Sequence, residues 1–402
     1  MTVFSEATPL VKNFWTHVCA NERHHIDIHG AATLSCEKSR RNGNVCMKDN
    51  PASPKPASIK DVARLAGVSH STVSRALRNS GRVNTETIRR IRLIADESGY
   101  RTSAVGRSLA TRRTNTIGVV VTTITDAFAA EVVSGIEEAA AECGYSIFLA
   151  NSGADPDREI RVVHTLEERR VDGIVVTASR VGALYVPMLS KMRVPIVLLN
   201  NQHPSEFAHS VMIANTEASI AATQHLIALG HRRIAYIGDR NGRQSDTERF
   251  AGYRHSLDAA DLPFEPDLVF HGDGSPEGGM EGIKRLRSLP APPTAVFCYD
   301  DVTAIGALRQ TRILGMRVPD DLSIVGFDDL PLVRYLDPPL TTVRQPMRQM
   351  GRLAMETLLD ILAGSGTNHN LKVSAEMILR ESTSAPRQHS VGLEAGSVLP
   401  AV

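Results

Sequence analysis

The stretch SIKDVARLAGVSHSTVSRALRN, residues 58–79, determines the fold predicted for the N-terminal part of the chain. Ser58 followed by Asp61 has the spacing of a capping box, which satisfies the first free amides of a helix. Gly67 supplies a tight turn, and Ser69 caps a second short helix. Two short helices joined by a glycine turn make a helix-turn-helix, whose second helix fits the major groove of DNA. Their apolar positions recur at helical spacing: Ile59, Val62, Ala63 and Ala66 in the first, and Val73, Ala76 and Leu77 in the second.

A third helix is predicted from about Thr85 to Ser98, where Gly99 ends it. Its expected packing residues are Ile88, Ile91, Leu93, Ile94 and Ala95. The segment 59–114 that contains all three helices has twelve Lys and Arg residues against four Asp and Glu. Such a compact basic module is typical of a protein that contacts a polyanion.

The whole chain conceals this charge, because its 402 residues hold 45 Lys and Arg against 44 Asp and Glu. Residues 1–58 contribute +2, segment 59–114 contributes +8, and residues 115–402 contribute −9. A basic module joined to a larger acidic body indicates a DNA reader with a second function. Because 42% of the residues are hydrophobic and no long apolar run occurs, we expect two or three globular domains and no membrane span.

Cysteine and histidine usage gives no sign of a disulfide framework or a metal site. The five cysteines are odd in number and irregularly spaced, which is typical of the reducing cytosol. The three cysteines of the first 58 residues are spaced 17 and 10 apart and form no CxxC pair. We therefore predict no metal and no cofactor. Residues 1–57 show no persistent period and no signal-peptide pattern, so a disordered extension is expected, with Met47 as an alternative start of translation.

The run DVARLAGVSHSTVSRAL, residues 61–77, resembles the DNA-binding headpiece of the LacI/GalR family of bacterial transcription regulators. The resemblance continues through GYRTSAVGRSLATRRTNTIGVVV, residues 99–121, and on to about Ser382. It implies that His70 and Ser71 read bases and that Arg75 is a basic contact residue. Hydroxyls and amides suited to phosphate oxygens are offered by Ser69, Thr72, Ser74 and Asn79.

The resemblance also implies a hinge helix from Ser103 to Ala110, with Leu109 as the residue that wedges into the minor groove. The chain departs from the family here, because Thr102-Ser103 replaces the usual Pro-Asn and Gly106 replaces a common alanine. Glycine inside a short helix costs about 1 kcal/mol relative to alanine. We therefore expect the hinge to order only when the dimer binds operator DNA.

From Thr116 onward, apolar Val- and Ile-rich runs alternate with amphipathic segments. Such alternation predicts parallel sheets covered by helices on both faces. Two units in tandem indicate two doubly wound lobes with a ligand between them, at the carboxyl ends of the strands. The resemblance implies the same body, a periplasmic-binding-protein-like fold with three crossings between lobes. The expected helices are 129–143, 156–169, 183–192, 216–229, 247–260, 277–288 and 301–314.

The predicted fold class is thus an all-α helix-turn-helix headpiece followed by a two-lobed α/β body. The predicted domains are a disordered extension at 1–57, the headpiece at 58–102, the hinge at 103–114, the effector-binding and dimerisation body at 115–384, and a disordered tail at 385–402. The tail shows no leucine heptads, which favours a dimer over a tetramer.

Ligand-binding residues are expected just after strands, where polar and aromatic side chains gather. Arg249, in ERFAGY, matches a family arginine that contacts the effector. Asp126-Ala127-Phe128 stands where the family generally has Asn-Pro-Phe, so the pocket floor differs. The mixture suits a sugar, while Arg180 and Arg249 leave a sugar acid or sugar phosphate open. The full candidate set is Asp126, Phe128, Arg180, Asn200, Asn201, Arg249, Tyr299, Asp328 and Gln345.

The predicted function is a homodimeric regulator of transcription that binds palindromic operator DNA in the bacterial cytoplasm; a repressor is favoured and an activator remains open. An enzyme is not expected, because no dinucleotide fingerprint follows the first strand of the body and no catalytic constellation is visible. The alternative is a sugar-binding solute receptor or chemosensory module with no DNA role. The body fits that alternative equally well, but the helix-turn-helix would then have no purpose.

Overall fold

The computed structural model describes residues 57–78, 83–101, 113–179, 192–200, 209–364 and 369–387. It divides into two compact units between Tyr100 and Arg101. Within the described residues, no helix has both the length and the apolar character needed to cross a membrane.

The described part of the first unit contains three helices, α2 (Ile59–Ala66), α3 (His70–Leu77) and α4 (Thr85–Glu97). The capping box is present: the Ser58 hydroxyl accepts from the Asp61 amide, and the Asp61 carboxylate accepts from the Ser58 amide at 3.0 Å. Gly67 ends α2 with a φ of 64°, the left-handed conformation that glycine adopts without strain. The predicted helix-turn-helix is thereby confirmed.

The core of this unit lies where the three helices meet. Val62, Val73 and Ile91 are completely buried, one from each helix. The prediction was wrong for Leu93, which is 59% exposed on the outer face of α4. Its neighbours at helical spacing already fill the small core, so no inward position remains for it.

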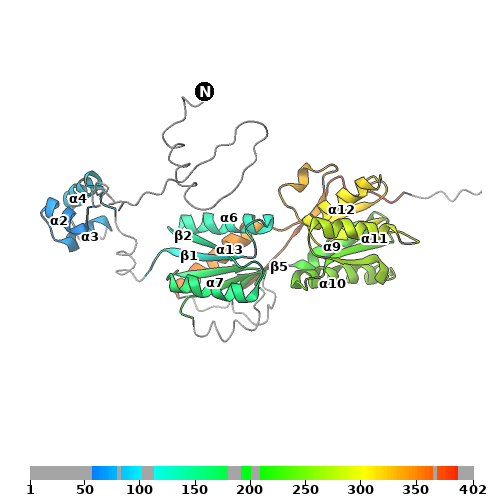
Figure 1. Ribbon diagram of the computed structural model, residues 1–402, viewed down its shortest axis with the longest axis horizontal. Coiled ribbons are helices and arrows are strands. Elements are labelled where there is room, and N and C mark those ends of the chain that lie inside the picture. Colours follow the sequence, from blue (N-terminus) through cyan, green and yellow to red (C-terminus); the bar gives the residue numbers. More distant parts are fainter. Residues whose placement is uncertain are drawn as a thin grey trace, which may run out of the picture. The chain divides into compact units, whose positions relative to one another are not determined.

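The second unit, Arg101–Val402, has two lobes (Figure 1). The described sheet of the first lobe has six parallel strands in the order β11-β5-β4-β3-β1-β2. Its strands are β1 (Thr116–Val121), β2 (Ser146–Asn151), β3 (Gly173–Thr177), β4 (Ile196–Leu199), β5 (His209–Ile213) and β11 (His369–Val373).

Helices cover both faces of this sheet. Val119 and Val121 belong to the cluster that includes α6 (Ala127–Glu142) and α13 (Met347–Ala363). Val120 belongs to the cluster that includes α7 (Pro156–Glu168) on the opposite face. Because alternate residues of a strand face opposite ways, burial on both sides requires the continuous apolar run seen in the sequence.

The second lobe repeats the plan, with the strand order β12-β10-β9-β8-β6-β7. The neighbours are parallel except β12, which pairs antiparallel with β10 at the edge. The strands are β6 (Ile234–Asp239), β7 (Val269–Gly272), β8 (Ala295–Cys298), β9 (Ser323–Asp328), β10 (Thr341–Arg344) and β12 (Glu376–Ile378).

Helices α9 (Asn215–Ala228) and α10 (Gln244–Ala259) cover one face of this sheet, and α11 (Pro276–Arg287) and α12 (Asp301–Ile313) cover the other (Figure 1). Two short 3-10 turns, η2 (Pro266–Leu268) and η3 (Val333–Tyr335), complete the described elements.

In the described part, the chain passes between the lobes three times, as predicted. The passages join β5 to α9, β10 to α13 and β11 to β12. The helix expected at 247–260 begins earlier, at Gln244. No side chain caps that start, so the sequence held no capping signal to mark it. The helix expected at 183–192 falls largely outside the described residues.

Candidate functional site

The first candidate site is the start of α3 in the N-terminal unit. The Ser69 hydroxyl accepts from the Thr72 amide at 3.2 Å and lies 2.8 Å from the Ser71 hydroxyl. Ser69, His70 and Ser71 are all exposed, so the first turn of α3 presents polar side chains to solvent. A helix start of this kind fits the recognition end of a helix-turn-helix, where side chains reach base edges.

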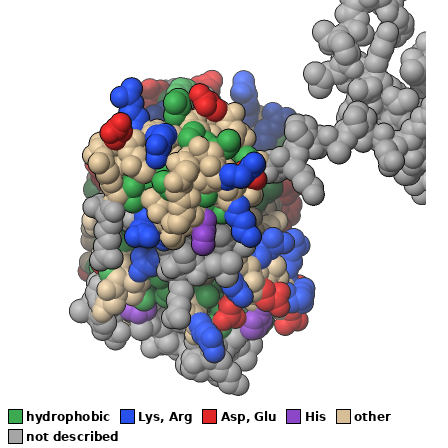
Figure 2. Space-filling view, turned by 90° about the vertical axis from the view of Figure 1, so that its left-hand side faces the viewer, with side chains coloured by type: hydrophobic (Ala, Val, Ile, Leu, Met, Phe, Trp, Pro, Cys, Tyr) green, Lys and Arg blue, Asp and Glu red, His purple; other side chains and the backbone are tan. Residues whose placement is uncertain are grey.

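Arg75 lies one turn further along α3 and is exposed. Its guanidinium donates to the Ser71 carbonyl at 3.3 Å and to the Ser71 hydroxyl at 3.4 Å. Ser74 is half-buried, and its hydroxyl accepts from Arg78 at 2.8 Å. The two arginines therefore lie against the helix surface, where they remain able to donate to phosphate or base oxygens. Figure 2 shows how Lys and Arg side chains are spread over the described surface of the face that it presents.

Five predicted site residues lie outside the described part of the chain. For DNA binding these are Asn79, Ser103 and Leu109, and for the effector they are Arg180 and Asn201.

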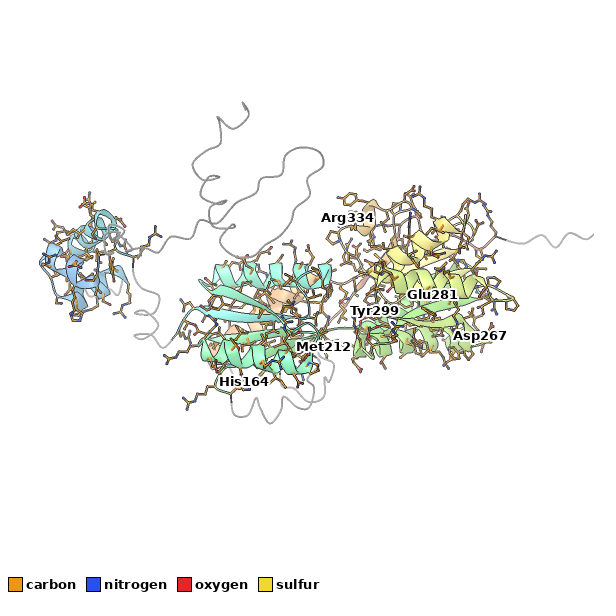
Figure 3. All side chains as sticks on the ribbon, viewed as in Figure 1. His164, Met212, Asp267, Glu281, Tyr299 and Arg334 are labelled. Atoms are coloured by element: carbon orange, nitrogen blue, oxygen red, sulfur yellow. The ribbon has the colours of Figure 1, made fainter. Side chains whose placement is uncertain are left out.

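The second candidate site is a cavity of about 720 Å³ in the second unit. It is lined from both lobes by residues that follow the carboxyl ends of strands, including Asp126 after β1 and Tyr299 after β8. Figure 3 shows Tyr299 on the side of the second lobe that faces the first. This is the position expected for a ligand in doubly wound sheets. Seven of the candidate effector residues line this cavity: Asp126, Phe128, Asn200, Arg249, Tyr299, Asp328 and Gln345.

Arg249 is the buried cation of the cavity, with a side chain only 4% exposed. Its guanidinium donates to Asn215 Oδ1 at 3.0 Å and to the Tyr299 carbonyl at 2.6 Å, and it lies 3.5 Å from Asp328 Oδ1. The guanidinium also stacks 3.6 Å from the centre of the Phe327 ring. Arg249 therefore joins α9, β8 and β9 at the wall of the cavity.

Asp328 ends β9 with a φ of 117°, a backbone conformation unusual for a non-glycine residue. Burial raises the pKa of its carboxyl to about 7, although Arg249 lowers it. Its Oδ1 accepts from Gln345 Nε2 at 2.5 Å. The other amide atom, Gln345 Oε1, is buried at the cavity and has no hydrogen-bond partner among the residues that the structure describes. An unpaired buried acceptor favours a ligand that donates a hydrogen bond there.

Tyr299 and Asp300 follow β8 and complete the wall of the second lobe. The Tyr299 hydroxyl lies 2.8 Å from the Ser245 hydroxyl at the start of α10. Asp300 caps α12 by accepting from the Thr303 amide at 2.7 Å, and burial raises the pKa of its carboxyl. These contacts fix the orientation of both side chains before any ligand arrives.

In the first lobe, Asp126 caps α6 and accepts from the Phe128 amide at 2.9 Å. Asn200 follows β4 with a φ of 50°, which asparagine tolerates better than most residues. Both are therefore local caps or turns as well as cavity residues.

The cavity also includes polar residues that the sequence interpretation did not single out. Arg243 is the N-cap residue of α10, and its Nε lies 3.1 Å from Asp239 Oδ2. Ser275 is the N-cap residue of α11, and its hydroxyl accepts from the Gly278 amide at 3.1 Å. A search for every polar residue that follows a predicted strand would have found these: Thr122, Thr123, Thr125, Asn151, Arg243, Ser245 and Ser275.

Comparison with known proteins supports the same reading. Residues 58–103 match the model of bacterial regulatory proteins of the lacI family, and residues 223–383 match that of a periplasmic binding protein-like domain. The transcriptional repressor CytR of Escherichia coli K12 is 36% identical over 332 residues, which is 82% of this chain and 97% of CytR.

Two solved structures of regulators resemble the fold over most of the chain. The lac repressor dimer bound to operator and the anti-inducer ONPF has a TM-score of 0.76 at 26% identity, covering 82% of this chain and all of that one. The transcriptional regulator CelR in complex with cellobiose has a TM-score of 0.61 at 32% identity, covering 81% of this chain and 99% of that one. With a helix-turn-helix at one end and a ligand-sized cavity in a two-lobed body, the chain belongs to the lacI family of bacterial regulatory proteins.

Proposed function

We propose that the chain is a homodimeric transcriptional repressor that binds a palindromic operator. A small effector bound in the cavity raises or lowers its affinity for that operator. The observation that supports this most is that one chain combines the exposed polar start of α3 with a cavity of about 720 Å³ between two sheets. The proposal includes a location in the bacterial cytoplasm, where the DNA partner lies, and a regulatory role in place of a catalytic one.

The effector is a neutral polyhydroxyl compound such as a sugar. Arg249 already lies against Asp328, and Arg243 against Asp239, so both cationic side chains of the described cavity wall have a carboxylate neighbour. An anionic effector would also meet the carboxylates of Asp126 and Asp300. Hydroxyls, in contrast, both donate to carboxylates and accept from guanidinium groups. The cellobiose bound to CelR has this chemistry.

The homodimer is supported by an apolar edge on the first lobe. Strand β2 is the last of its sheet, and its side chains Phe148 and Leu149 are 48% and 47% exposed. A groove of about 380 Å³ runs between β2 and α7 beside them. An exposed apolar edge strand is a place where a second copy of the chain can pack.

Selection of DNA from a random duplex library by the full chain tests the DNA role. We expect a palindromic site, with affinity that falls steeply as salt rises because phosphate contacts release counterions. Under the solute-receptor alternative, the protein would select no sequence.

A thermal-shift panel tests the effector role with neutral sugars, sugar acids and sugar phosphates, because a ligand selective for the folded state raises the melting temperature. We expect a neutral sugar to give the largest shift. A larger shift with a sugar phosphate would contradict the effector class but not the DNA role.

A further inference from the structure

The chain enters the body at residues 113–115, where one carboxylate binds two successive residues. Asp172 Oδ1 accepts from the Thr114 amide at 2.8 Å, and Asp172 Oδ2 accepts from the Asn115 amide at 2.9 Å. The Thr114 hydroxyl lies 2.9 Å from Asp172 Oδ1 and 2.8 Å from the Arg170 carbonyl. Both oxygens of the Asp172 carboxylate are therefore directed at the backbone that follows the linker to the headpiece.

Further hydrogen bonds hold residues 113–116 to other elements of the lobe. Arg113 donates to the Leu362 carbonyl near the end of α13 at 3.1 Å. The Ser146 amide donates to the Asn115 carbonyl at 2.9 Å, and the Asp172 amide donates to the Thr116 carbonyl at 2.8 Å. The hydrogen bonds that the Asp172 carboxylate accepts from Thr114 and Asn115 have a charged acceptor. They therefore belong to the strongest class of hydrogen bond at the junction.

Asp172 is connected to the cavity by rigid elements. It lies in the short turn after α7, whose opposite end follows the cavity residues Asn151, Gly153 and Ala154. A helix of 13 residues is about 20 Å long, so α7 spans the lobe from one edge to the other.

Strand β1 runs between the same two places, because it begins at Thr116 beside the junction and ends before the cavity residues Thr122 and Thr123. Helix and strand are packed without space: a Cβ added at Gly118 of β1 would lie 2.7 Å from a methyl of Leu166 on α7. The two elements must therefore move together when the cavity changes shape.

We propose that Asp172 is the positioning residue that makes the DNA-binding linker follow the first lobe, so that the cavity and the operator influence each other through α7, β1 and this carboxylate. Asp172 touches neither ligand. It holds the body end of the linker, at Thr114 and Asn115, against the end of α7, and the opposite end of α7 follows residues of the cavity wall. This inference rests on the proposed function.

Asp172→Asn is the sharpest substitution, since it keeps the shape and Oδ1 but places an amide N–H₂ group against the Asn115 amide, where both groups are donors. Thr114→Val is a second, milder variant that removes the hydroxyl and keeps the backbone. Glu168→Gln is the matched control: it removes one negative charge from the exposed end of α7, where the structure shows no hydrogen bond to its side chain within the described residues.

The experiment measures amide hydrogen exchange of the full chain, free and bound to the duplex that the wild-type protein selects. Coupling between two sites is reciprocal, so bound operator must alter the cavity even before the effector is identified. In the wild type and in Glu168→Gln, we expect operator to change the exchange of the peptides that cover 122–128 and 151–155 by at least threefold. In Asp172→Asn, the operator-induced change in exchange at these peptides should be less than half of the wild-type change, while operator still binds. Thr114→Val should show a change between those of the wild type and Asp172→Asn.

An Asp172→Asn protein that binds operator and shows the full wild-type change at the cavity would refute the inference and leave the proposed function intact. So would a wild-type protein that binds operator with no change at the cavity. A wild-type protein that selects no DNA would overturn the proposed function and the inference together.

Discussion

At the scale of single residues, the described wall of the cavity is dominated by the buried guanidinium of Arg249 and the carboxylates near it. Arg249 contacts Asn215, Tyr299 and Asp328, which come from separate elements. A buried charge of this kind is stable only while its partners remain, because removal of either member leaves an uncompensated charge in a poorly solvated site.

Arg249→Met should therefore lower the free energy of unfolding by about 3–5 kcal/mol at neutral pH. Adding Asp328→Asn in the same chain should restore part of this loss, since the unpaired carboxylate is then gone. Urea unfolding of the two single variants and the double variant measures the coupling. Arg240→Met is the control, because Arg240 is 66% exposed and its ion pair with Asp273 is worth at most about 1 kcal/mol. Purely additive losses in the double variant would contradict this account.

The raised pKa of Asp328, about 7, predicts a pH dependence of stability. A carboxyl whose folded-state pKa exceeds its ordinary value stabilises the fold below that ordinary value and loses this contribution as pH rises through the folded pKa. We expect the unfolding free energy of the wild type to fall, relative to Asp328→Asn, between about pH 4 and pH 7, by at most about 1.4 kcal/mol per pH unit. Parallel curves for the two proteins in urea titrations would show that Asp328 does not titrate in this window.

How far single residues can be predicted depends on whether their function leaves a trace in the sequence. Arg249, Tyr299 and Asp328 follow predicted strands or match a family motif, and the structure brings them to one wall. Arg243 and Ser275 also lie after strands, but nothing in the sequence around them distinguishes them from residues at other strand ends, and the fold shows that α10 and α11 begin at the cavity. The burial that raises the pKa of Asp328 is likewise a property of the folded state alone.

At the scale of elements, the helices that cover each sheet approach their neighbours through glycine. A Cβ added at Gly135 of α6 would lie 2.0 Å from the Arg348 carbonyl of α13, and one added at Gly351 of α13 would lie 2.2 Å from a carbonyl of α6. In the second lobe, Gly279 of α11 and Gly306 of α12 approach each other's helices in the same way. These backbones are too close for any side chain between them.

Gly135→Ala should destabilise the protein by about 1–3 kcal/mol, because the Arg348 carbonyl is backbone and cannot swing away. The sign of this stability change is informative, because alanine inside a helix otherwise stabilises by about 1 kcal/mol relative to glycine. Glu137→Ala, two residues along on the exposed face of α6, serves as the control and should change stability by less than about 0.5 kcal/mol. Thermal unfolding of the two variants decides; a stabilised Gly135→Ala protein would mean that α6 and α13 can separate at no cost.

Element order was predictable because strands buried on both faces are continuous apolar runs, and those from Thr116 to Phe327 stand out from the amphipathic helices between them. The antiparallel direction of β12 could not be predicted, because its short side-chain pattern does not indicate strand direction. The direction follows from the way the chain passes between the lobes. The start of α10 also escaped, because no capping side chain announces it.

At the scale of the whole molecule, positive and negative net charge lie in different segments of the chain. Segment 59–114 has a net charge of +8 and residues 115–402 have −9, so attraction to DNA is confined to the part that contains α2, α3 and α4. Under the proposed function, a palindromic operator is bound by two such parts in a fixed relation, and we expect the acidic body to supply the contact between copies.

The exposed edge of β2 is where this contact can be tested. Phe148→Glu places a charge on an apolar edge strand without disturbing a buried core, since Phe148 is 48% exposed. We expect the wild type to have a solution mass twice the 43.6 kDa of the chain and the variant to have the mass of one chain, measured by light scattering. Because two half-sites must then be bound independently, operator affinity should fall by at least about 100-fold, as expected when effective concentration is lost.

Leu379→Glu provides the control, for Leu379 is equally apolar and 62% exposed but lies beyond the end of β12 in the other lobe. A Phe148→Glu protein that stays dimeric would move the interface to another surface, and one that becomes a monomer yet binds the full operator with wild-type affinity would show that dimerisation is not what positions the two headpieces.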